Sequence, residues 1–387
     1  MNIKKNIIIL GILVAVTFGV VVMRNSGKER PQDTGSEQET QPAEIAEKIY
    51  VALEGEGKVA VLDARRKKVL STIDLTDRSE ASVQYMAHNV QVAPGGESVW
   101  VTANAMEEVA MKNGHGEDTN RKDDATPSDQ VIVIDPLNDK ITKRISLSPE
   151  NHLAHVVISP DNKKAYLTAQ EKGLVYIINT ANFAVEKTIN LGAQSGPHGL
   201  RITPDGAQVF IALLDGKAVA MLDTTTDEVE EYPFESGAVQ TAVTPDDRFA
   251  FVSLYTTKQI ARLERASGKI EKIGLPKEAK GPVQLYPTPD SRFVYVADQG
   301  YYFNQPTGDK VYRISVENGT VDQTISAGSA PHGVVVDSAG KFVYITNLLS
   351  DDVSIIDVAT GKEIARIPVG DMPNGISIWH RANGGTP

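Results

Sequence analysis

Histidines at a recurring position are the residues of this sequence best suited to chemistry. His88, His198 and His332 each lie six residues before a turn, and the last two stand in the tripeptide Pro-His-Gly. Imidazole is the commonest metal ligand in proteins and binds through a neutral ring nitrogen. These histidines are therefore candidate metal ligands, although any one of them can also simply cap neighbouring backbone groups.

Four further polar residues occupy nearly the same place. Asn374 lies at the equivalent position, whereas His155, Gln240 and Gln284 come one residue later in their segments. Successive side chains of a strand point to opposite faces, so these three should point away unless a β-bulge shifts the register. We include His155 among the metal ligands and expect Asn374, Gln240 and Gln284 to contact a ligand.

The element that must position these residues is a repeat. An aromatic–aliphatic–small tripeptide recurs and is followed by a strand of alternating apolar residues that ends in a polar one. Its copies begin at Tyr50, Trp100, Tyr166, Phe210, Phe251, Tyr295 and Tyr344. With the strands and Pro-Asp turns around it, each copy makes a unit of four short antiparallel strands, termed a to d. Such units predict an all-β, seven-bladed β-propeller.

The two ends of the repeat fit together. The first unit begins directly with its strand b, residues 48–53, and lacks a strand a. The chain ends with a spare strand a around residues 374–378. We therefore predict that the ring closes by pairing of the N- and C-terminal strands, which removes two open sheet edges.

Two insertions interrupt otherwise regular units, roughly at residues 103–129 and 298–310. Both are b–c connections, and these share one face of a propeller, here the top face, with the d–a connections that carry the histidines. The a–b and c–d turns occupy the other, bottom face. Long loops on a rigid scaffold often carry function.

The first insertion adds soft and acidic side chains. It contains Met106, Met111 and His115 among several Glu and Asp residues. Thioethers with imidazole suit Cu(I), whereas carboxylates with imidazole suit zinc or Cu(II). The alternative is a solvated acidic loop whose methionines are incidental. In the second insertion, Tyr301 and Tyr302 would contact a flat ligand or merely cover the channel rim.

The amino-terminal residues have the pattern of a membrane-targeting segment. Residues 1–23 combine two lysines with an apolar run and lack a cleavage site, which predicts an uncleaved signal anchor. Residues 24–47 are polar and predict a disordered acidic linker before the propeller at 48–387. We expect the propeller to lie outside the cytoplasm, in the periplasm or at the cell surface.

Composition excludes several classes of protein. The formal net charge is −11, which disfavours a nucleic-acid partner, because phosphate binding needs a basic face. Cysteine is absent, which rules out disulfides, thiolate metal sites and covalently attached c-type haem. No catalytic motif is recognisable.

The last unit carries a family resemblance. Phe-Val-Tyr-Ile-Thr-Asn at 342–347, Ala-Thr-Gly-Lys at 359–362 and Ile-Pro-Val-Gly at 367–370 resemble the YVTN β-propeller repeat. The resemblance extends over about residues 48–380. It implies relatives as different as archaeal surface-layer proteins, cytosolic lactonases and, more distantly, the haem-binding propeller of nitrite reductase. Fold alone does not select among these.

These observations leave three hypotheses for function. The first is a membrane-tethered extracytoplasmic protein that binds or transfers a transition-metal ion, copper or zinc, at the top-face channel mouth. The second is a haem- or metal-dependent redox or hydrolytic enzyme of the nitrite-reductase or lactonase type. The third is a surface module that binds another extracytoplasmic protein and no small ligand. We favour the binding protein over the enzyme.

Overall fold

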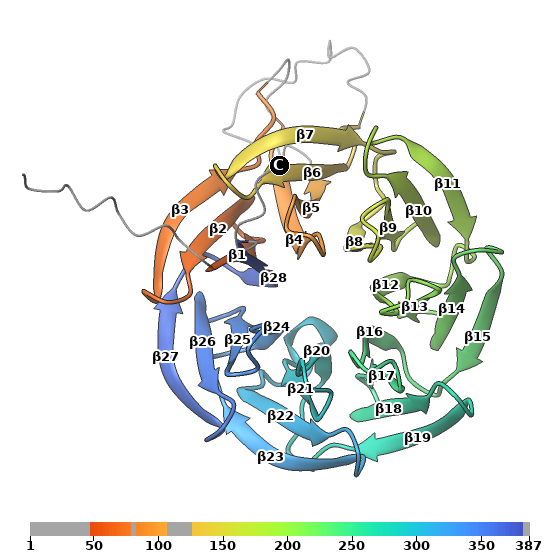
Figure 1. Cartoon of the computed structure of the whole chain (residues 1–387), viewed down its shortest axis with the longest axis vertical. Coiled ribbons are helices and arrows are strands. Elements are labelled where there is room, and N and C mark those ends of the chain that lie inside the picture. The colour runs from red at the N-terminus through yellow and green to blue at the C-terminus, as the bar shows by residue number, and fades with distance from the viewer. Residues whose placement is uncertain (1–46, 79–82, 107–125, 382–387) are drawn as a thin grey trace, which may run out of the picture. The chain divides into compact units, whose positions relative to one another are not determined.

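The computed structural model describes residues 47–78, 83–106 and 126–381. In this part of the chain, seven four-stranded antiparallel sheets are arranged in a ring around a central axis (Figure 1). The predicted seven-bladed β-propeller is therefore confirmed. The segment 1–46, with the predicted anchor and most of the linker, lies outside the described residues. Among the described residues, no helix is long and apolar enough to cross a membrane.

The strands follow one another from the centre of the ring outward in every blade. Blade 1 has β28 (Pro373–His380), β1 (Glu47–Leu53), β2 (Lys58–Asp63) and β3 (Lys68–Asp74). Blade 2 has β4 (Tyr85–Val92), β5 (Val99–Ala105), β6 (Gln130–Asp135) and β7 (Lys140–Ser146). Blade 3 has β8 (Leu153–Ile158), β9 (Lys164–Ala169), β10 (Leu174–Asn179) and β11 (Val185–Asn190). Blade 4 has β12 (Pro197–Ile202), β13 (Gln208–Leu213), β14 (Ala218–Asp223) and β15 (Val229–Pro233).

The remaining blades repeat this order. Blade 5 has β16 (Ala238–Val243), β17 (Phe249–Leu254), β18 (Gln259–Glu264) and β19 (Lys269–Gly274). Blade 6 has β20 (Pro282–Pro287), β21 (Phe293–Asp298), β22 (Lys310–Ser315) and β23 (Thr320–Ser326). A short 3₁₀ helix, η1 (Tyr301–Phe303), lies in its b–c insertion. Blade 7 has β24 (Pro331–Val336), β25 (Phe342–Asn347), β26 (Asp352–Asp357) and β27 (Lys362–Pro368).

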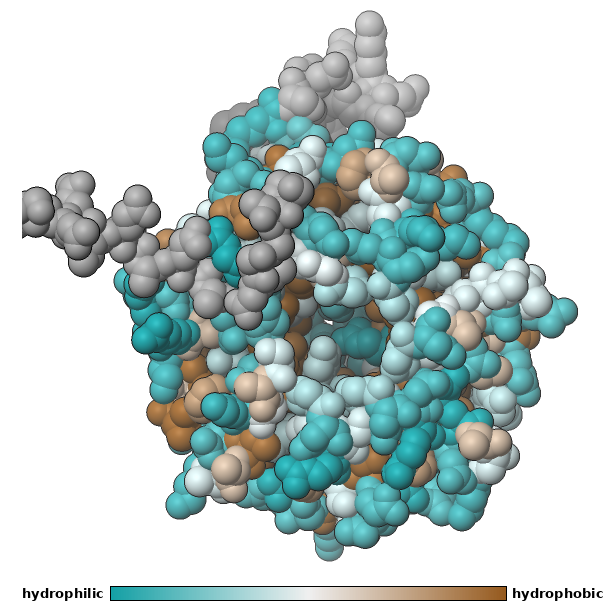
Figure 2. Space-filling view, viewed as in Figure 1, coloured by the Kyte–Doolittle hydropathy of each residue, from teal (hydrophilic) through white to brown (hydrophobic). Residues whose placement is uncertain are grey.

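The hydrophobic core lies between neighbouring blades. Trp100 of blade 2, for example, belongs to one buried cluster with Leu167 and Tyr176 of blade 3. The outermost strands are mostly exposed, as along β11. Figure 2 shows the consequence from one face, with hydrophobic residues between the sheets and mostly hydrophilic ones around the central hollow. Each blade thus completes its core with its neighbours.

The ring closes through blade 1, in the arrangement predicted from the spare terminal strands. β28 pairs antiparallel with β1, and Tyr50 lies opposite Ser377. A second contact joins β1 to blade 2, because the Lys48 ammonium forms an ion pair of 2.9 Å with Asp139. The C-terminal strand is therefore the innermost strand of the blade that begins the chain.

Every innermost strand contains a register irregularity, and this bears on the direction in which the His155 side chain was expected to point. In β8 the register shifts between Leu153 and Val156, so two residues lie opposite one of β9. The Thr168 hydroxyl accepts the His155 backbone N–H (3.0 Å) and donates to the carbonyl of His198 in the next blade (2.6 Å). Such β-bulges re-aim side chains. The bulge in β8 is thus the exception that the sequence analysis allowed for, and His155 joins the other histidines.

Steric crowding explains why glycine follows histidine in Pro-His-Gly. At Gly199 a Cβ atom would lie 2.3 Å from the Oε1 atom of Gln240. At Gly333 it would lie 2.4 Å from the carbonyl oxygen of Asn374. Neighbouring inner strands approach so closely that each bulge has room for only one large side chain at these two positions.

Candidate metal centre

Three histidines from consecutive blades meet in the central channel. His88, His155 and His198 belong to β4, β8 and β12, and one ring nitrogen of each lies within 4.8 Å of the other two. All three side chains are buried, and the ring centroids of His155 and His198 are 5.0 Å apart. Imidazole nitrogens bound to one zinc ion lie roughly 3.3–3.6 Å apart, from metal–nitrogen bonds of about 2.0–2.1 Å. Contraction by about 1 Å would therefore bring them to one ion.

Burial keeps the rings of His155 and His198 neutral. Desolvation lowers the pKa of His198 to about 3, with a further contribution from His88. Burial also lowers the pKa of His155 well below its ordinary value, helped by His198 and His88. Neutral imidazole is the form that binds a metal ion. Two of the three rings therefore stay in the ligand form well below pH 6.5.

His198 already makes the hydrogen bond that a metal-bound histidine usually makes with its other ring nitrogen. Its Nδ1 atom lies 2.9 Å from the carbonyl oxygen of Val239, which can only accept. The proton is therefore on Nδ1, and the lone pair of Nε2 is free. Metal-bound histidines usually donate their other N–H to a carbonyl or carboxylate in this way.

His155 is held in the opposite tautomer. The backbone N–H of Thr241 donates to Oε1 of Gln240 (2.8 Å), which turns the amide NH₂ of Gln240 toward Nδ1 of His155 (3.3 Å). Nδ1 is then an acceptor, and the proton is on Nε2. This Nε2 atom is buried and has no hydrogen-bond partner. Metal binding at this nitrogen requires the proton to move and the Gln240 amide to turn over.

A carboxylate lies behind His88. The Oε2 atom of Glu54, in the β1–β2 turn, is 3.7 Å from Nδ1 of His88. It also accepts from the side-chain amide of Asn374 and from the hydroxyl of Tyr302 (2.9 Å). Desolvation raises the pKa of Glu54, but His88 and these donors outweigh it and lower the pKa to about 2. The site therefore contains one negative charge at neutral pH, and Nε2 of His88 is buried without a partner.

His332 stands apart from the three clustered rings. Its Nδ1 atom lies 2.7 Å from the amide nitrogen of Gln299, whose Oε1 accepts from the backbone of Tyr302 (3.2 Å). The ring of Tyr302 contacts His332 edge-on, with centroids 5.5 Å apart. The insertion between β21 and β22 thus covers the channel beside His332.

A small side cavity lies on the top face, beside the metal centre. It has a volume of about 270 Å³, and its lining includes Met86, Asp129, Glu150, His152 and Glu171. His152 lies edge-on to His88, with centroids 5.3 Å apart. Desolvation and the neighbouring His88 lower the pKa of His152 to about 4. Thioether, imidazole and carboxylate groups therefore line one side of the metal centre.

The other predicted site residues have different locations. Gln284 is buried on β20 and its amide nitrogen has no partner, whereas Tyr301 is largely exposed. Met106 is exposed at the start of the first insertion. Met111 and His115 lie outside the described residues.

Sequence reasoning missed Glu54, His152 and Gln299. Glu54 lies in a turn, and His152 precedes its strand with a positive φ of 48°. Gln299 directly follows β21. None of them occupies the recurring position of the other ligands, so only their place on the top face could have indicated them.

The family described as a domain of unknown function (DUF5074) matches residues 97–375 of this chain. That is most of the chain, so the protein belongs to this family. No curated protein matches it in sequence. The YVTN resemblance of the last unit remains a prediction.

Solved structures share the fold at low identity. Virginiamycin B lyase from Staphylococcus aureus is 18% identical, with a TM-score of 0.59 over 76% of this chain and 91% of that one. The dihydro-haem d1 dehydrogenase NirN, in complex with DHE, is 15% identical, with a TM-score of 0.56 over 85% of this chain and 65% of that one. Apo AztD from Citrobacter koseri is 12% identical, with a TM-score of 0.58 over 86% and 97%. At these identities the likeness concerns the fold alone.

Proposed function

We propose that this member of the DUF5074 family is a binding protein for a transition-metal ion, copper or zinc, held by His88, His155 and His198. The observation that carries the proposal is the convergence of three buried imidazoles from three blades, with ligand nitrogens within 4.8 Å of one another. Glu54 adds a negative charge beside His88. Burying these groups without a ligand is costly, because Nε2 of His88 and of His155 has no partner.

The arrangement suits binding and transfer better than turnover. A metal ion held by neutral imidazoles exchanges through the adjacent side cavity, where Met86 and His152 offer intermediate ligands.

Calorimetry of the purified full-length chain with Zn(II), Cu(II) and Cu(I) tests the proposal. His198→Gln should weaken binding by on the order of 100-fold, because even the loss of a residue that only hydrogen-bonds a metal ligand costs about 10–100-fold. His332→Gln is the matched control, since it changes the same repeat position outside the cluster, and it should leave the affinity nearly unchanged. Binding that is equally tight in the His198→Gln variant and the parent would refute the centre.

One observation favours a second candidate, a haem- or metal-dependent enzyme. The Nε2 atoms of His155 and His332 are buried without partners, and the amides of Gln240 and Gln299 place a proton on each. Two unused N–H donors would suit an oxyanion or an iron-bound ligand. The visible absorption spectrum of the purified protein tests the haem-dependent form of this candidate, because haem gives intense bands that zinc and Cu(I) lack.

We also propose that the propeller is membrane-tethered and lies outside the cytoplasm. Support comes from the sequence of residues 1–47, a lysine-flanked apolar run followed by a polar segment. Alkaline phosphatase and β-galactosidase fused after Lys48 report the location. Active β-galactosidase with inactive phosphatase would reverse this assignment.

A further inference from the structure

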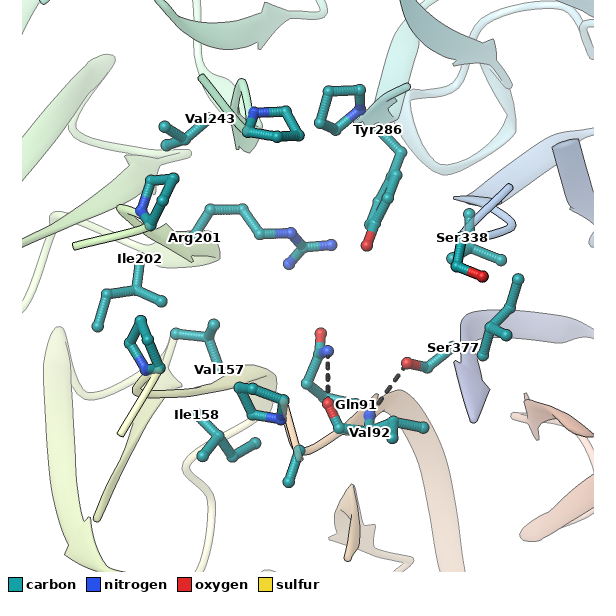
Figure 3. A pocket seen from close by; sticks show the side chains of 18 of the residues that line it. Gln91, Val92, Val157, Ile158, Arg201, Ile202, Val243, Tyr286, Ser338 and Ser377 are labelled. Carbon is teal, nitrogen blue, oxygen red and sulfur yellow. Dashed lines mark hydrogen bonds between the residues drawn. The ribbon is translucent and has the colours of Figure 1, made fainter. Parts of the chain in front are cut away.

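A second cavity, of about 730 Å³, opens at the opposite end of the channel (Figure 3). β12 runs from His198 near its start to Arg201 near its end, and Arg201 lines this cavity. The prolines of the a–b turns form its rim: Pro94, Pro160, Pro204, Pro245 and Pro289. The cavity therefore belongs to the bottom face and is distinct from the metal centre.

The Arg201 guanidinium extends into the middle of this cavity (Figure 3). One of its nitrogens, Nη1, donates to the carbonyl of the adjacent Leu200 (2.9 Å), and its Cζ atom lies 5.9 Å from the ring centroid of Tyr286. None of the residues that line the cavity is acidic. This is unexpected in a chain of net charge −11, and it leaves the positive charge without a carboxylate partner among these lining residues.

A guanidinium in such surroundings favours an anionic ligand. Desolvation lowers the pKa of Arg201, which shows that the surroundings disfavour its charge. A partly buried charge is stabilised when an opposite charge with matching hydrogen bonds joins it. The planar fork of arginine fits the two oxygens of a carboxylate.

Further polar groups surround the same space. The Tyr286 hydroxyl points toward the guanidinium from the opposite wall (Figure 3). The Ser377 hydroxyl accepts the backbone N–H of Val92 (3.0 Å), and its own hydrogen remains available. Gln91 donates to the carbonyl of Val92 (3.0 Å), which leaves its Oε1 atom free to accept. The cavity thus offers both donors and acceptors around one cation.

The walls between these polar groups are apolar. Val157, Ile158, Val243 and Val335 line the cavity together with the ring of prolines. Pockets for small organic ligands are typically about 300–1,000 Å³, mostly apolar, with a few convergent polar groups. Size and lining therefore fit an organic molecule better than a bare inorganic ion.

We propose that the bottom-face cavity binds a small organic carboxylate with an apolar body, whose carboxylate pairs with Arg201 and whose body lies against the valines and prolines. This binding is independent of the metal centre. The metal ion and the carboxylate occupy opposite ends of one channel.

Calorimetry of the full-length chain with 2-naphthoate as the probe tests this proposal. 2-Naphthoate should bind at least about tenfold more tightly than the neutral 2-naphthamide, a difference that reports the ion pair. Arg201→Gln should remove most of that preference, and Arg201→Lys should recover part of it. Arg248→Gln is the matched control, because it removes one exposed positive charge of the same face that does not line the cavity and is paired with Asp246 and Glu317, and it should leave naphthoate affinity within about twofold of the parent.

Three further results decide the matter. Inorganic phosphate should compete poorly, because it lacks the apolar body, and His88→Gln should leave naphthoate binding unchanged. Tyr286→Phe should weaken naphthoate binding a few-fold. It replaces Arg201→Gln as the test variant if Arg201→Gln does not fold. Equal binding of naphthoate and naphthamide to the parent protein would overturn the proposal, as would phosphate competing as well as naphthoate.

Discussion

The side-chain amide nitrogen of Gln240 lies 3.3 Å from Nδ1 of His155, and this contact sets which nitrogen of the ring carries the proton. The amide cannot turn over freely, because its oxygen accepts the backbone N–H of Thr241. Gln240 is therefore a positioning residue that opposes metal binding by His155, and the affinity of the centre should depend on it.

Gln240→Glu should tighten metal binding by about 10–100-fold, the usual range for a residue that hydrogen-bonds a metal ligand. A carboxylate at this position keeps the Thr241 contact and accepts a hydrogen bond from Nδ1–H of His155, which leaves the lone pair of Nε2 for the metal. Gln284→Glu is the matched control, because it adds the same charge at the equivalent position of the next blade. If both variants tighten binding equally, the gain is only electrostatic and the tautomer argument fails.

Glu54→Gln should weaken metal binding by about tenfold. The variant keeps an acceptor for Tyr302 but removes the negative charge that lies 3.7 Å from Nδ1 of His88. The positive charge of the metal ion is then no longer compensated by the carboxylate of Glu54. Glu56→Gln changes an exposed carboxylate of the same turn, and its affinity, measured by calorimetry, should match that of the parent.

The metal-free protein should lose thermal stability as the pH falls from about 6.5 toward 4. Histidines in the unfolded chain take up protons near pH 6.5, whereas burial lowers the pKa of His198 and of His332 to about 3 in the folded chain. The unfolded state therefore binds more protons in this window, so stability rises with pH and is fully present above it.

Melting temperatures in a chelating buffer between pH 4 and 8 measure this dependence. His198→Gln should flatten the slope, because it removes one of the groups that the folded state keeps neutral. A slope that is unchanged in this variant would show that His198 does not titrate as its burial implies. Metal affinity should likewise persist below pH 6.5, the ordinary imidazole value at which the sequence alone would predict its loss.

Deleting residues 371–387 should lower the melting temperature by more than about 10 °C. The deletion removes β28 and its buried Ile376 and Trp379, and it leaves β1 as an open edge. Each large buried side chain contributes about 1.5–3 kcal/mol, and a few such losses shift the melting temperature of a large domain by this amount. Deleting only 382–387 leaves β28 intact and is the control; equal melting of the two truncated proteins would contradict the closure.

The sequence by itself determined the architecture. Seven tripeptides such as Tyr344-Ile345-Thr346, constant strand spacing and Pro-Asp turns each encode local structure, and local structure repeated seven times leaves a closed ring as the way to bury every sheet. The spare strand after Met372 also fixed the closure, because its partner was missing at the other end.

The tertiary structure decided which histidines meet. His332 shares the repeat position of His88 and His198, yet His155, one residue out of register, joins them instead. The bulge in β8 makes this possible, because it places two residues opposite one of β9 and lets the second of them, His155, face the channel, where a hydroxyl of Thr168 that bonds across two blades holds it. Glu54 and Arg201 likewise became candidate functional residues only in the folded chain. Their charges matter because of the groups that surround them in the channel, and those groups come from distant parts of the chain.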